Sequence, residues 1–431
     1  MYSPNNKPIV PRIHAHWIYQ KYPFLLKYSA EIRVLKNYLL KIKPFTIHII
    51  FLPIAILLKL LGYQTLNVNY IRIGHICSDI DAYLKIKILF PDRYKPVIFC
   101  NHLDFPNSYF TDLLKKKIKI IRVPIKNSYL FCRTLNSNPV SVFDVSCFME
   151  QEPQCIKNLY TITGNLPLFS IGIDQDTNAQ IFLEKKFNKK IDKWVCMHYR
   201  NSDYTSNFQK GLKIPNDDYG QDFRNTNPEH LIPVLKRLNN LGIHVFLMGH
   251  DAHFPIQDNE YFTNFSCCPW KTDFLDVYLS AKCLFYFGNS SGSAQISRMF
   301  GRPTIGSNLA LLHCFNGTNT DITAPKKYYD ISLGRYLTLS EILKSPVRFA
   351  RNADEYIAAG ILLHENSAEE LNLLLSEMLE NIGLIKIDDE NFDHFFINQY
   401  HKILSDNEIN ISINNSNISI KYLLNNLDFI K

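Results

Sequence analysis

The segment from Cys283 to Ile305, CLFYFGNSSGSAQISRMFGRPTI, constrains the fold more than any other part of the chain. It predicts a strand over 283–287, a loop of small residues, a helix that ends at Gly301, and a further strand. The loop 288–293 has no bulky side chain, so a ligand can approach its backbone closely. Because the loop opens a helix, the segment predicts a phosphate site, with an ordinary strand-to-helix turn as the alternative.

Composition limits the class of protein. A chain of 431 residues, 46% of them hydrophobic, suggests two or three domains with substantial cores. The net charge of +7 comes largely from scattered lysines without an arginine-rich run, so we expect no nucleic-acid partner. The ten cysteines form no CxxC pair, and the first residues lack the apolar core of a signal peptide. Both features favour reduced thiols and a cytoplasmic location.

The first 65 residues differ from the rest. The stretch 44–58, PFTIHIIFLPIAILL, is apolar but shorter than the ~20 residues that a membrane-spanning helix needs. An apolar segment with basic neighbours predicts a helical segment that attaches to the inner surface of the cytoplasmic membrane. A buried helix or a contact between subunits is the alternative. The basic neighbours are Lys27, Arg33, Lys36, Lys41, Lys43 and Lys59.

From residue 68 onward, strand and helix patterns alternate. Strands are predicted over 68–73, 97–100, 118–123, 194–197 and 243–248. Helices are predicted from Asn227 to Asn240 and from Thr272 to Ala281, each with a capping residue at its start. Such alternation is typical of α/β domains with parallel sheets. The predicted units are a helical segment 1–65, Rossmann-like domains 66–190 and 191–385 facing a cleft, and an appendage 386–431.

Polar residues follow several predicted strands of the second domain, where ligands bind in open parallel sheets. His198 and Arg200 point to the same side of their strand, and the Arg200 guanidinium suits a diphosphate. The alternative is a surface arginine paired with Asp203. Arg224 is a second candidate anion ligand, and Gly249 ends the next strand. A further candidate is Asp276, whose alternative role is that of an ordinary helix-start or surface residue.

The first domain offers candidate bases. Gly74 allows a ligand to approach, and His75, followed by Asp79, can take a proton from a hydroxyl group. Asp79 with Asp81, and Asp174 with Asp176, match a DxD pattern that binds metal in some sugar transferases. We expect these pairs to be chance matches and predict no metal site, because no His, Cys and carboxylate cluster has suitable spacing.

Taken together, these segments resemble a family of bacterial glycosyltransferases with a GT-B-like architecture. The resemblance covers about 70–380 and is carried by IRIGH at 71–75, WVCMHYRNSDY at 194–204, 223–249, 274–305 and ENSAEEL at 365–371. HYR at 198–200 is also similar to the HxR element of fucosyltransferase-like enzymes, in which the arginine binds the donor diphosphate. A single arginine stands here where some of those families have two, which leaves the nucleotide open.

The resemblance implies transfer of a sugar from a nucleotide-sugar donor to a glycan or lipid-linked acceptor of the bacterial surface, inverting and without metal or cofactor. The acceptor would lie against the first domain, where His75 or Asp79 acts as the base. A nucleotide-sugar epimerase on the same fold, or a sugar- or nucleotide-binding protein without turnover, are the alternatives. The donor-binding residues predicted are His198, Arg200, Asp203, Arg224, Gly249, Asp276, Asn289, Ser290, Ser291, Gly292 and Ser293.

Overall fold

The computed structural model of the 431-residue chain describes twelve stretches of it. Three of the predicted site residues, Asp203, Ser290 and Ser291, lie outside the described residues, as does the basic stretch before residue 49. The described ranges are 49–70, 72–101, 106–124, 128–143, 159–160, 162–200, 222–289, 292–310, 318–350, 352–386, 402–403 and 417–430.

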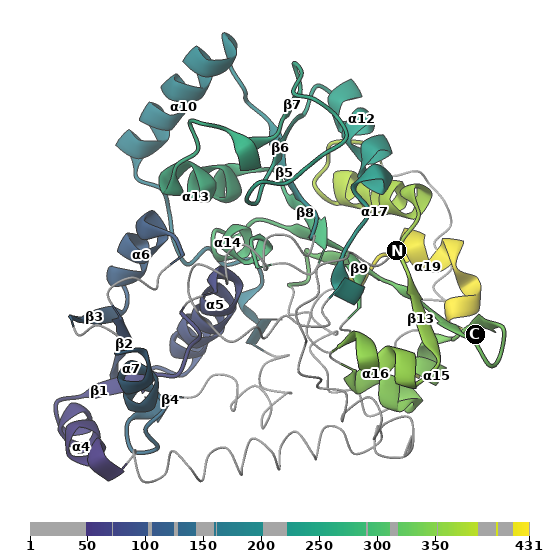
Figure 1. Ribbon diagram of the computed structural model, residues 1–431. Helices are drawn as coiled ribbons and strands as arrows, with labels where there is room; N and C mark the ends of the chain where they lie inside the picture. The colour runs from purple at the N-terminus through teal and green to yellow at the C-terminus, as the bar shows by residue number, and fades with distance from the viewer. Residues whose placement is uncertain are drawn as a thin grey trace, which may run out of the picture.

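The first domain contains a four-stranded parallel sheet in the order β3-β2-β1-β4, at the lower left of Figure 1. Helices connect its strands, as parallel neighbours require. Its first strand crosses the predicted boundary at residue 65. The elements are α4 (Leu52–Leu60), β1 (Tyr63–Leu66), α5 (Ile73–Leu89), β2 (Lys95–Asn101), α6 (Ser108–Lys115), β3 (Lys119–Val123), α7 (Tyr129–Asn136) and β4 (Val142–Phe143).

The strand predicted over 68–73 is wrong. The strand is β1, which ends at Leu66, and Ile73 already begins helix α5. The buried residues Ile76, Cys77 and Ile80 recur at helical spacing, so the segment forms a helix with one face buried. A short apolar run does not distinguish a strand from the start of a helix. Gly74 and His75 therefore lie in the first turn of a helix and not in a loop.

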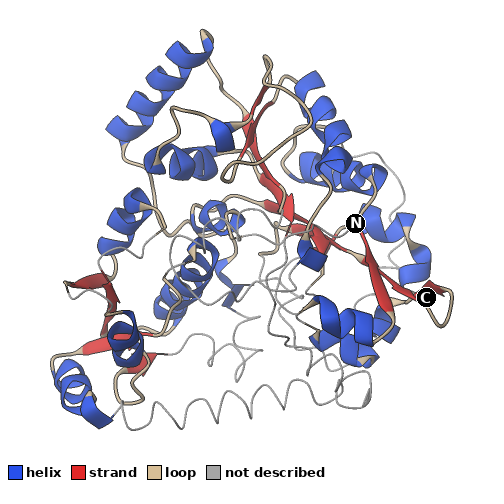
Figure 2. Cartoon of the chain, viewed as in Figure 1, coloured by secondary structure: helices blue, strands red, loops and turns tan. Residues whose placement is uncertain are grey.

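The second domain contains a seven-stranded parallel sheet in the order β14-β10-β9-β8-β5-β6-β7, drawn in red across the upper right of Figure 2. Its edge strand β14 comes from the segment predicted to be an appendage. The elements are α10 (Ile173–Phe187), β5 (Trp194–His198), α12 (Ile232–Asn240), β6 (His244–Leu247), β7 (Phe262–Thr263), α13 (Asp273–Lys282), β8 (Tyr286–Asn289), α14 (Ala294–Met299), β9 (Thr304–Leu309), β10 (Ile322–Pro325) and β14 (Asn417–Ile418).

Alternation along β5 explains how helices cover both faces of this sheet. Trp194 and Cys196 pack with α10 and α13, whereas Val195 and Met197 pack with α12 and α17 (Ala368–Asn381). Since all four side chains are buried, the strand is apolar on both faces, as the sequence predicts. Two parallel α/β sheets in two domains confirm the predicted fold class.

A small antiparallel sheet in the order β12-β11-β13 extends the second domain beside helices α15 and α16. The predicted cap at Thr272 is confirmed, because its side chain caps α13. Capping boxes also join Thr338 to Glu341 and Ser367 to Glu370. The remaining elements are β11 (Lys327–Asp330), β12 (Arg335–Tyr336), α15 (Leu339–Lys344), α16 (Ala353–Ala358), β13 (Ile361–His364) and α19 (Ile420–Asn425), with short 3₁₀ turns at Asp222–Arg224, Pro228–Leu231, Phe265–Cys267, Pro346–Phe349 and Leu427–Phe429.

The two domains share one apolar core. Ile76 and Ile80 of α5 belong to the same buried cluster as Val277 of α13 and Ile296 and Met299 of α14. Helix α5 thus packs on the second domain as well as on its own sheet, and Figure 1 shows α5 and α14 side by side at the centre. The first turn of α5 is therefore held at a set position relative to the second sheet.

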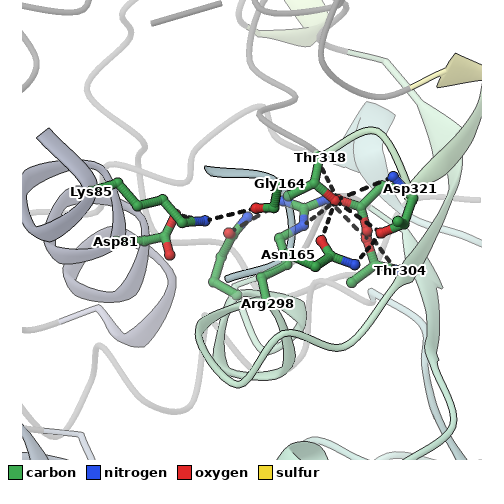
Figure 3. A network of polar contacts seen from close by, with 10 residues as sticks. Asp81, Lys85, Gly164, Asn165, Arg298, Thr304, Thr318 and Asp321 are labelled. Carbon is green, nitrogen blue, oxygen red and sulfur yellow. Dashed lines mark hydrogen bonds and ion pairs between the residues drawn. The ribbon is translucent and has the colours of Figure 1, made fainter. Parts of the chain in front are cut away.

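A buried polar network strengthens this junction (Figure 3). Lys85 of α5 pairs with Asp81 at 3.1 Å and donates to the carbonyl of Gly164 at 3.4 Å. Asn165 exchanges hydrogen bonds with Thr318 and Thr320, and Asp321 beside them pairs with Arg298 at 3.2 Å. Asp321 also accepts two hydrogen bonds each from Thr304 and Thr318, of 2.6–3.1 Å. The network links α5 to α14 and to the strands around it.

Candidate active site

The carboxyl ends of the central strands bring the predicted donor-site residues together. His198 ends β5 and lies opposite Gly288, and Asn289 ends the neighbouring strand β8. Gly249 follows β6 on the other side. It has a φ of +119°, and a Cβ there would lie 3.3 Å from His198 Cδ2. Because the strands are parallel, their ends meet at one sheet edge, where ligands bind in open α/β folds.

His198 is neutral at pH 7. Burial, and then the nearby Arg200 guanidinium, lower its pKa to about 4, with Asn289 acting in the opposite direction. Among the described residues, the buried Nδ1 of His198 and Oδ1 of Asn289 find no hydrogen-bond partner at normal geometry. The two side chains lie close enough for Asn289 to raise the His198 pKa as a hydrogen-bond partner does. Buried polar atoms are normally satisfied, and a ligand that bonds to this pair would satisfy them.

Two arginines are carried to the same edge by backbone contacts. The Asn289 amide donates to the carbonyl of Arg224 at 2.9 Å and to the Thr226 hydroxyl at 3.1 Å. The backbone N–H of Thr226 in turn donates to the carbonyl of Arg200 at 3.1 Å. Arg200 and Arg224 are both half-buried and belong to one hydrogen-bonded corner of the site. This arrangement suits an anion, because guanidinium groups bind phosphate in a forked geometry.

Two lysines that the sequence analysis did not single out add positive charge. Lys271 donates to the carbonyl of Gly249 and lies 3.4 Å from Asp276, and its charge helps to lower the pKa of His198. Lys326 is buried, donates to the carbonyl of Asn225 at 2.7 Å, and has its pKa lowered by burial. Lys326 directly follows β10, so the rule that led to Arg200 also pointed to this lysine. No comparable signal marked Lys271.

Asp276 is the carboxylate beside these cations. Burial raises its pKa to about 6, against the lowering effect of Lys271. It lies one turn into α13, next to Lys271 and near Asp273 and His250. A carboxylate here opposes the binding of an anion at neutral pH and stops doing so once it is protonated.

The first turn of α5 meets this edge from the other domain. A Cβ at Gly74 would lie 2.4 Å from Gly292 Cα, so the two backbones are in direct contact and neither position has room for a side chain. His75 is exposed in that first turn, and Asp79 is half-buried one turn later. Residues four apart lie on one helix face. Of the two predicted bases, His75 lies next in the chain to the glycine that touches the second domain.

Other predicted residues have structural partners. Ser293 shares a 2.5 Å hydrogen bond with the buried Tyr286 hydroxyl, so its own hydroxyl faces the core. In the DxD pairs, Asp81 pairs with Lys85, and Asp176 pairs with Lys282 and accepts from Tyr278. Within the described residues, no three His, Cys, Asp or Glu side chains gather as metal ligands do, and no helix is long and apolar enough to cross a membrane.

Comparison with known proteins gives two structural likenesses. No family model matches the chain, and no curated protein matches its sequence. The structure is similar to ADP-heptose lipopolysaccharide heptosyltransferase II of E. coli, with 12% identity and a TM-score of 0.35 over 56% of this chain and 84% of that one. It is also similar to TibC, an iron-containing dodecameric glycosyltransferase of enterotoxigenic E. coli, with 12% identity and a TM-score of 0.28 over 57% of this chain and 60% of that one. Both are bacterial glycosyltransferases, and neither likeness decides what this chain binds or transfers.

Proposed function

We propose that this chain is a glycosyltransferase that moves a sugar from a nucleotide-sugar donor to a hydroxyl group of a glycan or lipid-linked acceptor. The contact between Gly74 and Gly292 is the observation that carries the proposal. It brings the helix turn with the exposed His75 to the second domain, whose sheet edge carries the cations. Sugar transfer needs these two parts: a cationic site for the departing diphosphate and a base for the incoming hydroxyl.

The second domain would bind the donor. As the bond between the anomeric carbon and the diphosphate oxygen breaks, negative charge grows on that oxygen. Arg200, Arg224 and Lys271 supply fixed positive charge for it, and stabilisation that grows with the charge lowers the barrier. The neutral His198 would contribute a hydrogen bond and no charge. These cations do for the leaving group what a divalent metal does in other transferases.

The first domain would bind the acceptor. A ring nitrogen of His75 takes the proton from the acceptor hydroxyl as its oxygen attacks the anomeric carbon, and Asp79 is the second candidate for this role. Attack from the face opposite the diphosphate inverts the configuration in a single displacement. The acceptor class that we propose is a bacterial surface glycan, such as lipopolysaccharide, capsule or a glycoprotein, modified on the cytoplasmic side.

Binding of the donor tests the cationic edge. We expect Arg200→Ala to weaken binding of the preferred nucleotide among UDP-, GDP-, CMP- and dTDP-sugars by about 10- to 100-fold, measured by titration calorimetry. Lys271→Ala should cause a smaller loss of the same kind. Arg335→Ala, which removes an exposed arginine paired with Glu341, is the matched control and should leave binding unchanged. Equal affinity in all four proteins would exclude this edge as the donor site.

Turnover tests the base and separates the alternatives. His75→Ala should lower kcat by about 100-fold or more while donor binding persists, because His75 belongs to the acceptor side. Conversion of the donor without any acceptor would indicate an epimerase instead. Binding without turnover, across a panel of glycan acceptors, would indicate a non-catalytic binding protein.

A further inference from the structure

Helix α4 has an apolar face that the described residues of its own domain do not cover. One side packs inward, with Ala55 fully buried and Phe51 in edge contact with Phe131 at 4.8 Å between ring centroids. The opposite side is also apolar but exposed. A helix that is hydrophobic all round is normally buried on every side, so the exposed side requires a further partner. The exposed residues are Ile49, Ile50, Ile54, Ile56, Leu57, Leu60 and Leu61.

The exposure is large and continuous. Ile50 is 70% exposed, Leu57 55% and Leu60 80%, and these positions recur at the spacing of one helix face. Ile88 and Phe90, at the end of α5, are also more than half exposed. We call the exposed residues of α4 and of the turns on either side of it the α4 apolar face. Figure 1 shows α4 at the outer end of the first sheet, away from the second sheet.

The charges beside the α4 apolar face are positive. Helix α4 contains no acidic residue, and Lys59 lies in its last turn. Lys59 sits over the ring of Tyr94 at 5.6 Å, and the exposed Arg93 and Lys95 are the chain neighbours of Tyr94. The nearby acidic residue Asp92 is paired with Lys87. An apolar helix face with a cationic border complements a bilayer that has acyl chains below an anionic headgroup layer.

We infer that the α4 apolar face is the surface by which this protein docks on an anionic lipid bilayer, with the helix in the plane of the interface. The isoleucine and leucine side chains enter the acyl boundary, and Lys59, Arg93 and Lys95 contact the headgroups. Docking goes beyond the proposed function and does not depend on it. If that function holds, docking also brings the acceptor-binding domain to the surface where lipid-linked acceptors lie.

Vesicle flotation tests the docking with the full chain. We expect the protein to float with phosphatidylcholine vesicles that contain about a third phosphatidylglycerol, and to float less with phosphatidylcholine alone. Replacing both Leu57 and Leu60 by Glu should reduce the floated fraction on the order of tenfold. Replacing Lys59 and Arg93 by Glu should abolish the preference for anionic vesicles and leave weak binding to neutral ones.

Controls keep the result interpretable. Leu333→Glu changes a leucine of similar exposure, 54%, in the second domain and should not alter flotation. Thermal unfolding of each variant shows whether the fold persists, since Leu57 and Leu60 point away from the core. Absence of flotation by the unchanged chain, or equal losses in the control and the α4 variant, overturns the inference. A change of oligomeric state in the α4 variant, without a change in flotation, overturns it in favour of a contact between copies.

Discussion

Two buried polar clusters lie near the centre of the molecule, and they differ in how closely their charged groups are paired. At the junction of the domains, Asp321 receives four hydrogen bonds and the Arg298 ion pair, all from this chain. At the edge of the second sheet, His198 and Asn289 keep buried atoms without a normal hydrogen bond among the described residues. The first cluster also contains two such atoms, Asp81 Oδ1 and Arg298 Nε, but both belong to ion-paired groups, whereas His198 and Asn289 are neutral groups.

The difference distinguishes a cluster that stabilises the fold, at the junction of the domains, from a cluster suited to binding a ligand, at the edge of the second sheet. Both clusters contain arginine and lie within reach of α5, so residue type alone does not tell them apart. A carboxylate faces Arg298 at 3.2 Å, whereas Lys271 and Lys326 near the sheet edge lie farther from their carboxylates, at 3.4 and 3.8 Å. A cation that is paired at a longer distance is more readily available to an anion.

Removing one partner of the junction cluster should have the largest effect. Arg298→Ala leaves the buried Asp321 carboxylate without its counter-charge, and we expect the free energy of unfolding to fall by about 3 to 5 kcal/mol. Urea unfolding measures it. Arg335→Ala, which breaks an exposed ion pair, should cost much less. An equal decrease in the free energy of unfolding of the two variants would mean that the junction cluster contributes no more to stability than an exposed ion pair.

The second-largest effect is expected from a side chain introduced at the contact between Gly74 and Gly292. Gly74→Ala places a Cβ against the backbone of Gly292, and we expect a loss of about 1 to 3 kcal/mol in the free energy of unfolding. Transferase activity of the protein that remains folded should also fall, because the shifted helix turn displaces His75. Gly172→Ala is the control, since a Cβ there meets only the Gln175 side chain at 3.4 Å. Full activity of Gly74→Ala would show that the contact does not position the base.

The smallest effect concerns pH at the sheet edge. The raised pKa of Asp276, about 6, means that this carboxylate is charged at pH 7.5 and largely protonated at pH 5. Its negative charge opposes a diphosphate, so binding should strengthen about fivefold as the pH falls across that range. The free energy of unfolding should also increase as the pH falls from 7.5 to 5. Because the pKa of Asp276 is higher in the folded protein than in the unfolded chain, deprotonation of this carboxyl group at higher pH destabilises the folded state. Asp276→Asn should bind equally tightly at both pH values, and an unchanged pH dependence in this variant would show that Asp276 is not its cause.

The sequence predicted those parts of the site that depend on strand order. Arg200, Asn289 and Gly249 were placed at one edge because parallel strands end on the same side. Lys326 also directly follows a parallel strand, β10, and lies at the same edge for the same reason. Lys271 lies in the connection before α13, whose path no local pattern predicts. The strand over 68–73 was misplaced because a few apolar residues suit either a strand or the first turn of a helix.

By itself, the sequence determined two α/β domains, the helix caps and the succession of β8, α14 and β9, because these follow from local periodicity and backbone preference. Only the tertiary structure decided that Gly74 touches Gly292 and that Arg298 pairs with Asp321. It also decided that one side of α4 is exposed among the described residues. These are contacts between segments far apart in the chain. They depend on how layers pack in space, which no local window of sequence contains.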